Sequence, residues 1–310
     1  MIKEQKNKNN VKIALIQSAV SEDIKKNLEI TLQKIKQAAK NGAQIVCLQE
    51  LFRTIYIGES ENKDYFKFAE ADNGETVAAM QKLAKENKIV IITPFFEVAA
   101  GKNKNTNEKE YFNTAVVVDA DGTIAGKYRK MHIPNDPGFW ERYYFKNGNL
   151  GFHAIQTKYA KIGVLICWDQ WFPEAARIMT LSGAEILFYP TAIGWYKEKE
   201  SAVYEEYKNG WLIMQRSHAI ANSVYVASVN RVGKEFADKS IDKVTFWGNS
   251  FVCGAFGQFI SHASENEEII YADCNLSENK DVRDSWGFFG GRRTDAYKGL
   301  LKKGIKDSKK

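Results

Sequence analysis

Apolar runs of strand length alternate with helix-like segments along most of this chain. The run VKIALIQ at residues 11–17 precedes a segment whose apolar residues recur at helical spacing and which ends at Gly42. The strand-like run AQIVCLQ follows at once. The order continues through a helix at residues 75–88, a strand at 89–98 and a strand pair joined by the turn ADG at 120–122. Such alternation predicts layered α/β packing.

The pattern restarts after the connecting residues 132–158. A strand KIGVLIC, a helix from PEAARIMTLSG, a strand AEILFYP, a long helix and a strand at residues 224–230 form the second half. The shorter segments 248–260 and 267–275 have strand patterns and are expected to complete a second sheet. We therefore predict two mixed sheets packed face to face, with helices outside each. The lysine- and asparagine-rich residues 99–110 predict an exposed hairpin loop.

Length and charge predict a single domain without a nucleic-acid partner. A chain of 310 residues with 44% hydrophobic composition can bury one large core, and no linker divides it. We predict one domain at residues 11–301, with a C-terminal extension from about residue 284. The net charge of +6 lies in residues 1–10 and 302–310, which are predicted to be disordered basic tails. The body is neutral and has no RNP, zinc-finger or helix-turn-helix motif.

The sequence has no pattern of a membrane or metal protein. No apolar stretch approaches about eighteen residues, and no apolar segment of a signal peptide follows the lysine-rich start. We therefore expect no membrane partner and a cytoplasmic location. The four cysteines are widely separated, with no C-x-x-C pair and no histidine at ligand spacing. H-E-x-x-H, G-x-x-x-x-G-K and G-x-G-x-x-G are absent, so no metal and no cofactor are expected.

Three reactive side chains lie where predicted strands end. Glu50 closes QIVCLQE, Lys130 closes GKYRK and Cys167 closes GVLIC. Taken singly, these residue types are ordinary as an ion-pair partner, a surface charge and a buried thiol. Together they suit nucleophilic catalysis, because a thiol needs a base and the oxyanion formed at a carbonyl needs a positive donor. The backbone N–H of Trp168 and a helix N-terminus after Cys167 are expected to assist, the latter by favouring the thiolate.

The chain resembles the carbon–nitrogen hydrolases of the nitrilase superfamily in four ordered blocks: CLQELF, GKYRKMHIP, ICWDQWFPEAAR and AEILFYPTAIG. The resemblance covers nearly the whole chain and implies a four-layer αββα sandwich. It also implies that Glu50 is the general base, Lys130 the oxyanion-stabilising lysine and Cys167 the nucleophile. The block FWERYYF places Glu141 where that superfamily has a supporting carboxylate. Two glutamates beside one lysine would hold its ammonium, and one of them could stay protonated.

Within the superfamily, HIPNDPGFWERYYF, CWDQWFPEAAR and YPTAIG are most similar to the branch that acts on N-carbamoylputrescine. The resemblance implies cleavage of a ureido C–N bond through a covalent Cys167 intermediate, giving putrescine, carbon dioxide and ammonia in polyamine biosynthesis. Asn135 stands where that branch usually has an acid. A β-ureidopropionase and an aliphatic or omega-amidase remain alternatives with the same triad. A non-catalytic protein on the same scaffold is a further alternative.

A small substrate with a free ammonium needs a carboxylate or an aromatic face at the far end of its pocket. Segments beside the motif blocks supply five candidates for such contacts, namely Tyr56, Glu59, Asp136, Trp140 and Trp195. His132 lies two residues from Lys130, and we favour a structural role for it because the signature of papain-like proteases is absent. Arg177 is expected to form a scaffold ion pair.

The segment DSWGFFGGRRTDAY at residues 284–297 is too aromatic to lie comfortably in water. Chains with such an exposed segment tend to bury it by association. We therefore expect a homodimer or a larger homo-oligomer.

Overall fold

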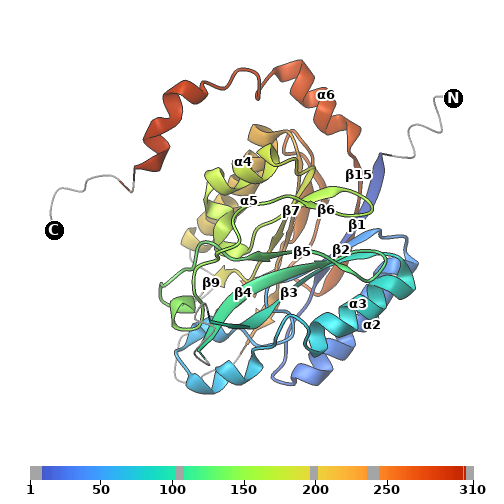
Figure 1. Ribbon diagram of the computed structural model, residues 1–310, viewed down its shortest axis with the longest axis vertical. Coiled ribbons are helices and arrows are strands. Elements are labelled where there is room, and N and C mark those ends of the chain that lie inside the picture. Colours follow the sequence, from blue (N-terminus) through green and yellow to red (C-terminus); the bar gives the residue numbers. More distant parts are fainter. Residues whose placement is uncertain (1–8, 102–107, 196–201, 236–243, 303, 305–310) are drawn as a thin grey trace.

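Two six-stranded mixed sheets form the centre of the computed structural model, which describes residues 9–101, 108–195, 202–235, 244–302 and 304 (Figure 1). The first sheet has the order β15-β1-β2-β3-β4-β5. Its strands β1, β2 and β3 are parallel, and β15 and β4 are antiparallel to their neighbours. These strands are β1 (Asn10–Gln17), β2 (Ile45–Leu48), β3 (Val90–Ala100), β4 (Lys109–Val118), β5 (Ile124–Arg129) and β15 (Glu268–Asn275).

The second sheet has the order β14-β13-β10-β8-β7-β6, with β7, β8 and β10 parallel. Its strands are β6 (Ile155–Gln156), β7 (Lys161–Val164), β8 (Ile186–Pro190), β10 (Tyr225–Val229), β13 (Phe251–Cys253) and β14 (Phe259–His262). A small antiparallel sheet of order β11-β12-β9 lies apart from these two. It consists of β9 (Gly194–Trp195), β11 (Val232–Lys234) and β12 (Thr245–Trp247).

Helices cover the outer face of each large sheet. Helices α2 (Ile24–Lys40) and α3 (Glu75–Asn87) pack on the first sheet, and α4 (Pro173–Leu181) and α5 (Ala202–Asn222) pack on the second (Figure 1). Helix α2 begins at Asp23, whose carboxylate accepts hydrogen bonds from the Lys25 and Lys26 N–H groups at 3.0 Å. The remaining helices are α6 (Ser277–Trp286), η1 (Ile57–Glu59), η2 (Lys63–Phe68), η3 (Glu141–Tyr143), η4 (Cys167–Trp171) and η5 (Thr294–Leu301).

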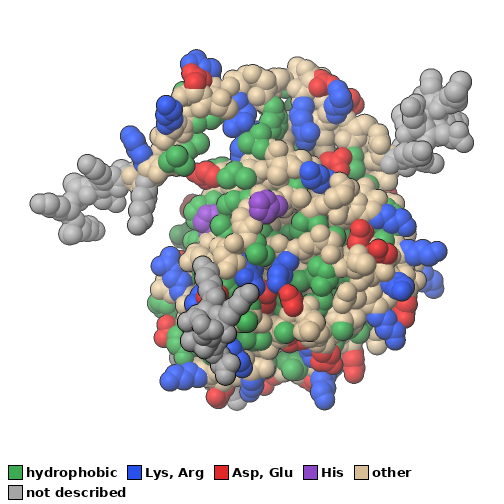
Figure 2. Space-filling model, in the orientation of Figure 1, with side chains coloured by type: hydrophobic (Ala, Val, Ile, Leu, Met, Phe, Trp, Pro, Cys, Tyr) green, Lys and Arg blue, Asp and Glu red, His purple; other side chains and the backbone are tan. Residues whose placement is uncertain are grey.

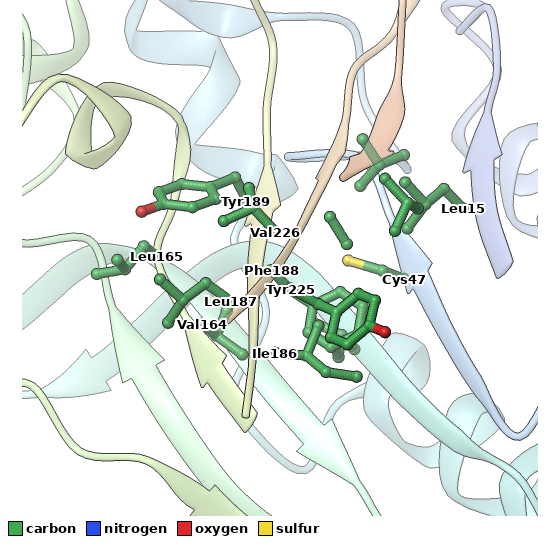
Figure 3. Close-up of a cluster of buried hydrophobic side chains, with 14 of the residues drawn as sticks. Leu15, Cys47, Val164, Leu165, Ile186, Leu187, Phe188, Tyr189, Tyr225 and Val226 are labelled. Atoms are coloured by element: carbon green, nitrogen blue, oxygen red, sulfur yellow. The ribbon is translucent and has the colours of Figure 1, made fainter. Parts of the chain in front are cut away.

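Alternate residues of β1 point to opposite sides of the first sheet. Ile13 and Leu15 belong to the cluster between the two sheets, whereas Ala14 and Ile16 pack with the residues of α2 and α3. Figure 3 shows Leu15 and Cys47 from the first sheet in the same buried cluster as side chains of the second sheet. The predicted αββα sandwich is therefore confirmed, because one apolar layer lies between the sheets and another lies beneath α2 and α3.

The expectation for the last strand was wrong. Residues 267–275 were predicted to complete the second sheet, but β15 pairs antiparallel with β1 along its whole length, from Asn10 with Asn275 to Gln17 with Glu268. Periodicity shows that a segment is a strand but carries no information on its partner. Strand β1 has β2 on one side, and β15 supplies partners for the backbone groups on its other side.

Several sequence expectations fall largely outside the described residues. These concern the tails at 1–10 and 302–310 and the hairpin loop at 99–110, although β3 and β4 pair beside that loop and β1 already begins at Asn10. Helix α6 contacts the second sheet, since Glu278 accepts from the Tyr225 hydroxyl, and the residues after α6 form an arch (Figure 1). In the described part of the chain, we find no helix with both the length and the apolar character needed to cross a membrane.

Candidate active site

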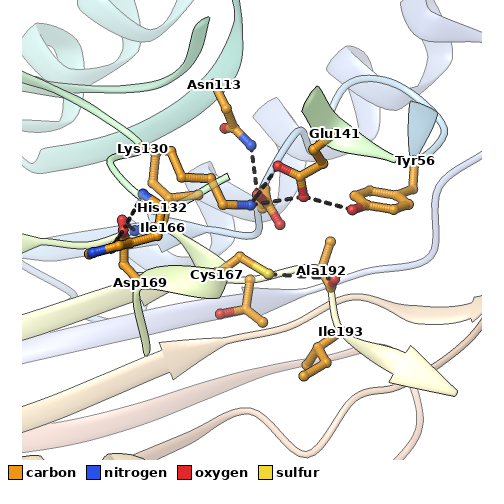
Figure 4. Close-up of polar contacts among 12 residues, drawn as sticks. Tyr56, Asn113, Lys130, His132, Glu141, Ile166, Cys167, Asp169, Ala192 and Ile193 are labelled. Carbon is orange, nitrogen blue, oxygen red and sulfur yellow. Dashed lines mark hydrogen bonds and ion pairs between the residues drawn. The ribbon is translucent and has the colours of Figure 1, made fainter. Parts of the chain in front are cut away.

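The three reactive residues found in the sequence meet at one edge of the sandwich. Glu50 follows β2, Lys130 follows β5 and Cys167 follows β7, and the ends of these three strands lie at the same edge (Figure 4). Strand β5 runs in the direction of β3, since β4 is antiparallel to both. Glu50 and Lys130 come from the first sheet and Cys167 from the second. The packing of the two sheets therefore creates this site, which neither sheet contains alone.

Lys130 is the centre of the polar network. Its side chain is 0% exposed, and its Nζ donates to Glu50 Oε1 at 2.8 Å and to the two oxygens of Glu141 at 2.8 and 2.7 Å. The Tyr56 hydroxyl donates to Glu141 Oε1 at 2.7 Å from the other side (Figure 4). Two carboxylates thus hold the ammonium in one position, as the sequence suggested for Glu50 and Glu141.

Glu50 has one occupied and one open oxygen. Oε1 accepts from Lys130 and from Asn113 Nδ2, the latter at 2.7 Å, whereas Oε2 has no hydrogen-bond partner among the described residues. The side chain is completely buried. Burying a carboxylate oxygen without a hydrogen-bond partner costs free energy. Such atoms in native structures call for an explanation, and one explanation here is that Oε2 accepts a proton during the reaction.

Cys167 lies on a strained turn. Its φ is +44°, in the left-handed region that non-glycine residues seldom adopt, and Leu51 directly after Glu50 has a φ of +48°. Such conformations cost about 1–3 kcal/mol each and persist where the surrounding structure enforces them. Cys167 is 3% exposed, and its Sγ lies 3.7 Å from the carbonyl oxygen of Ala192. The nucleophile candidate is thus held in a rigid turn.

The expected helix N-terminus at Cys167 needs correction. Cys167 opens η4, a single five-residue 3₁₀ segment, and α4 begins only at Pro173. Burial raises the pKa of the Cys167 thiol well above its usual value, Glu50 and Glu141 raise it further, and Lys130 lowers it. The resting group is therefore a thiol and not a thiolate. Trp168 is the second residue of η4, and the first N–H groups of a helical segment have no partner within it.

Burial and charge also shift the neighbouring groups. Burial raises the pKa of Glu141 to about 7, with Lys130 opposing and Glu50 adding to this shift. Burial alone would lower the pKa of Lys130, but Glu141 and Glu50 outweigh it and the net pKa is raised. Burial and the same two carboxylates raise the pKa of Tyr56 as well. The lysine is consequently a permanent cation, whereas Glu141 can hold a proton near neutrality.

Asp169 braces the nucleophile turn against the strand that carries the lysine. Its Oδ2 accepts from Ile166 N at 2.9 Å and from the Tyr128 hydroxyl at 2.7 Å. Its Oδ1 lies 2.6 Å from His132 Nδ1 and accepts from His132 N at 3.0 Å. Tyr128 and His132 lie two residues before and two residues after Lys130. Asp169 therefore connects the segment that carries Lys130 with the turn that carries Cys167. His132 also stacks on Phe172 and has the structural role that we expected.

A cavity of about 460 Å³ opens above Cys167. Of the weak substrate candidates, Asp136 and Trp195 line it, together with the side chain of Trp168. Asp136 is exposed at its mouth. The other lining residues are mostly apolar or aromatic: Pro134, Pro137, Phe139, Trp171, Ile193, Gly194, Tyr207 and Trp247. Such a wall suits a small elongated molecule whose reactive end reaches the thiol.

The remaining candidates do not line this cavity. Tyr56 is buried behind Glu141, and Glu59 is buried with its Oε1 3.3 Å from Val244 N. Trp140 is partly buried and belongs to the segment that leads into η3. Arg177 forms no ion pair among the described residues; its Nη2 donates to the Ala221 carbonyl at 2.8 Å, so that expectation was wrong.

Several residues of the site were missed in the sequence. Asn113 interrupts the apolar run of β4, and a polar side chain inside a buried strand is a usable signal. Asp169, Arg231 and Glu235 were not identified, because the contacts that link them to the site are with Tyr128, the Glu50 turn and Tyr56, all far away in the chain. Within the described residues no cluster of three or more His, Cys, Asp or Glu side chains could hold a metal ion. The arrangement is that of a buried thiol, a carboxylate with an open oxygen and a fixed cation.

Comparison with known proteins agrees with this geometry. The family model for carbon-nitrogen hydrolases matches residues 12–284. The chain belongs to the carbon–nitrogen hydrolase family. The chain is therefore a hydrolase of carbon–nitrogen bonds other than peptide bonds.

Relatives of this hydrolase span nearly its whole length. An N-carbamoylputrescine amidase of Arabidopsis thaliana is 43% identical over 94% of this chain and 95% of its own, and a citrullinase of Francisella tularensis is 40% identical over 95% and 99%. The crystal structure of a carbon-nitrogen hydrolase from Helicobacter pylori G27 matches with a TM-score of 0.89 and 44% identity, over 96% of this chain and all of the other. The family assignment thus covers the whole sandwich.

Proposed function

We propose that this hydrolase cleaves the ureido C–N bond of N-carbamoylputrescine, a step of polyamine biosynthesis. One observation carries the proposal: the buried thiol, base and lysine lie below a cavity in which Asp136 is the only charged residue among the described lining residues. A ureido group fits the polar end and an ammonium fits a carboxylate with aromatic walls. Four relatives named N-carbamoylputrescine amidase, 41–43% identical to this chain, support the same substrate.

In the proposed reaction, Glu50 Oε2 accepts the Cys167 proton while the sulfur attacks the ureido carbon. The tetrahedral oxyanion is stabilised by the Lys130 ammonium and the Trp168 N–H. Glu50 then returns its proton to the departing nitrogen, and a carbamoyl thioester remains on Cys167. Water, deprotonated by Glu50, attacks the thioester carbon, Glu50 returns the proton to the departing sulfur, and the carbamic acid released breaks down to carbon dioxide and an amine or ammonia. One substrate and one water give putrescine, carbon dioxide and ammonia.

Glu141 is proposed as the supporting carboxylate. It contacts Lys130 with both oxygens and the Tyr56 hydroxyl with one, so it fixes the direction of the ammonium. Because Lys130 stays charged throughout the working pH range, its stabilisation of the oxyanion does not depend on proton transfer. No cofactor is needed for these steps.

Ammonia release from a substrate panel tests the proposal. The panel contains N-carbamoylputrescine, citrulline, N-carbamoyl-β-alanine and glutaramate, with Cys167→Ala as the inactive control. We expect the highest kcat/KM for N-carbamoylputrescine. Preference for citrulline or N-carbamoyl-β-alanine would retain the ureido chemistry and overturn the substrate, preference for glutaramate would indicate an omega-amidase, and no turnover of any member would favour a non-catalytic protein.

Asp136 is proposed to hold the distal ammonium, with Trp195 in the adjoining wall. Asp136→Asn should raise KM for N-carbamoylputrescine about tenfold and leave kcat nearly unchanged, since a charge-assisted hydrogen bond is worth about 1.5–3 kcal/mol and this carboxylate is exposed. Butylurea has the same reactive group without the ammonium, and its KM should not change. Glu29→Gln, at an exposed position of α2, serves as the surface control. An unchanged KM for N-carbamoylputrescine would remove Asp136 from the site.

We also propose that residues 11–301 act as one domain in a cytoplasmic homodimer or larger homo-oligomer. The C-terminal segment forms an arch along the edge of the body (Figure 2), and Trp286, Leu300 and Leu301 on it are 61%, 65% and 91% exposed. Apolar surface of this kind is usually covered by a partner. All four cysteines are buried and free, as suits a reducing compartment. Sedimentation as a monomer at micromolar concentration would contradict the proposed oligomer. Recovery outside the cytoplasmic fraction would contradict the proposed location.

A further inference from the structure

Arg231 is a completely buried arginine behind the candidate active site. It follows β10 of the second sheet, and its side chain is 0% exposed. A charge at this depth needs several partners, because desolvation is not repaid by one weak contact. Its Nη1 donates to both oxygens of Glu235, at 2.8 and 2.7 Å. It is absent from the residues that line the cavity above Cys167.

The other terminal nitrogen of the guanidinium, Nη2, forms hydrogen bonds with the turn that carries Glu50. Nη2 donates to the carbonyl oxygens of Glu50 at 3.1 Å, Leu51 at 2.8 Å and Thr54 at 3.0 Å. Leu51 has the left-handed φ of +48°, so the turn adopts a conformation that its own residues disfavour. Nη2 has two N–H groups that these three carbonyls share, and Nη1 is held by Glu235, so the planar guanidinium fixes the turn in that conformation.

Glu235 extends the contact to the other carboxylate of the site. Its Oε2 accepts from Tyr56 N at 2.6 Å, and the Tyr56 hydroxyl donates to Glu141. The Arg231–Glu235 pair therefore contacts both the Glu50 turn and the residue that orients Glu141. Arg231 follows β10 of the second sheet, which also carries Cys167, and Glu235 follows β11 of the small sheet. Glu50 and Lys130 come from the first sheet.

We propose that Arg231, paired with Glu235, is a positioning residue that sets the Glu50 turn relative to Cys167 across the two sheets. This inference rests on the proposed role of Glu50 as the base. The open oxygen of Glu50 must face the thiol, and a small rotation of the turn would aim it elsewhere. Arg231 does not line the cavity above Cys167, so we expect its loss to affect the proton transfer and not binding.

Arg231→Lys is the test variant, because lysine keeps the charge but cannot form the fork. We expect kcat to fall by about 10²-fold with KM within about threefold, as for a small misplacement of catalytic groups. Arg53→Lys is the matched control. Arg53 is a buried arginine on the same turn, but its side chain pairs with Glu70, Glu75 and Thr76 on the far side from the site. Arg53→Lys should lower Tm by a similar amount and leave kcat within about threefold.

The alkylation rate of Cys167 by iodoacetamide gives a readout that needs no substrate. It should fall in Arg231→Lys as it does in Glu50→Gln, and it should not fall in Arg53→Lys. A normal kcat and alkylation rate in Arg231→Lys, or losses that match those of Arg53→Lys, would overturn the positioning role. If the wild-type protein turns over none of the panel substrates, the proposed substrate fails and the alkylation comparison still decides the role of Arg231.

Discussion

Replacing Cys167 by alanine should abolish hydrolysis, with kcat lowered by at least about 10⁴-fold. The reason is that the sulfur forms the covalent bond to the carbonyl carbon, and no neighbouring group can replace it. Of the thiols, Cys167 alone lines the cavity, among the described residues. Ammonia release under saturating substrate measures the effect. Mass spectrometry of the wild-type protein, quenched during turnover, should find an acyl adduct on Cys167.

The mass of that adduct also decides the order of departure. Loss of ammonia first would leave the aminobutyl-carbamoyl group on sulfur, whereas loss of putrescine first would leave a bare carbamoyl group. Cys274→Ala is the matched control, since Cys274 is a buried free thiol in β15 of the first sheet. It should cost about 1 kcal/mol of stability and no activity. More than a tenth of the wild-type rate in Cys167→Ala would exclude Cys167 as the nucleophile.

Glu50→Gln should lower kcat by about 10³-fold while the protein remains folded. Glutamine can still accept hydrogen bonds from Lys130 and Asn113, so the buried network survives, but it cannot take the thiol proton. Because burial raises the pKa of Cys167 well above 9, the thiol stays protonated without a base. The measurement is kcat against pH for both proteins, with Tm as the check on folding.

The sign of the pH dependence follows from the same shift. In Glu50→Gln the rate should rise with pH and keep rising beyond pH 9, since hydroxide then ionises a thiol whose pKa is raised. The wild-type rate should already be high near neutrality. Glu97→Gln is the control, because Glu97 is a buried carboxylate that pairs with Arg129 and Lys127 outside the site. A Glu50→Gln rate within tenfold of wild type at pH 7 would mean that another group is the base.

Much of the candidate site was predictable because its residues follow strands. Glu50, Lys130 and Cys167 are reactive types at the ends of apolar runs, and the topology brings these ends to one edge. Each of these residue types is common alone, but a thiol, a carboxylate and an ammonium at neighbouring strand ends indicate nucleophilic catalysis. Glu141 was predicted through resemblance and not through pattern, since it opens a short 3₁₀ turn with no periodicity.

The protonation state of the thiol could not be predicted in the same way. From the sequence, a helix beginning at Cys167 was expected to favour the thiolate, but η4 is one short turn and the group is buried. Desolvation and two nearby carboxylates outweigh the single lysine. The balance depends on burial, which is a property of all the surrounding chain. In the proposed mechanism Glu50 therefore has a larger task than the sequence suggested, because it must remove the proton of a thiol whose pKa is raised.

The sequence by itself determined the layered α/β architecture, the strand ends that bear the reactive residues and the membership of a hydrolase family. These features depend on periodicity and on residues that are neighbours in the chain. Only the tertiary structure decided that β15 joins the first sheet and that Arg231 grips the turn after Glu50, 180 residues away from Leu51. Such choices depend on which backbone groups and charges remain unpaired after the sheets pack, and local sequence does not encode that outcome.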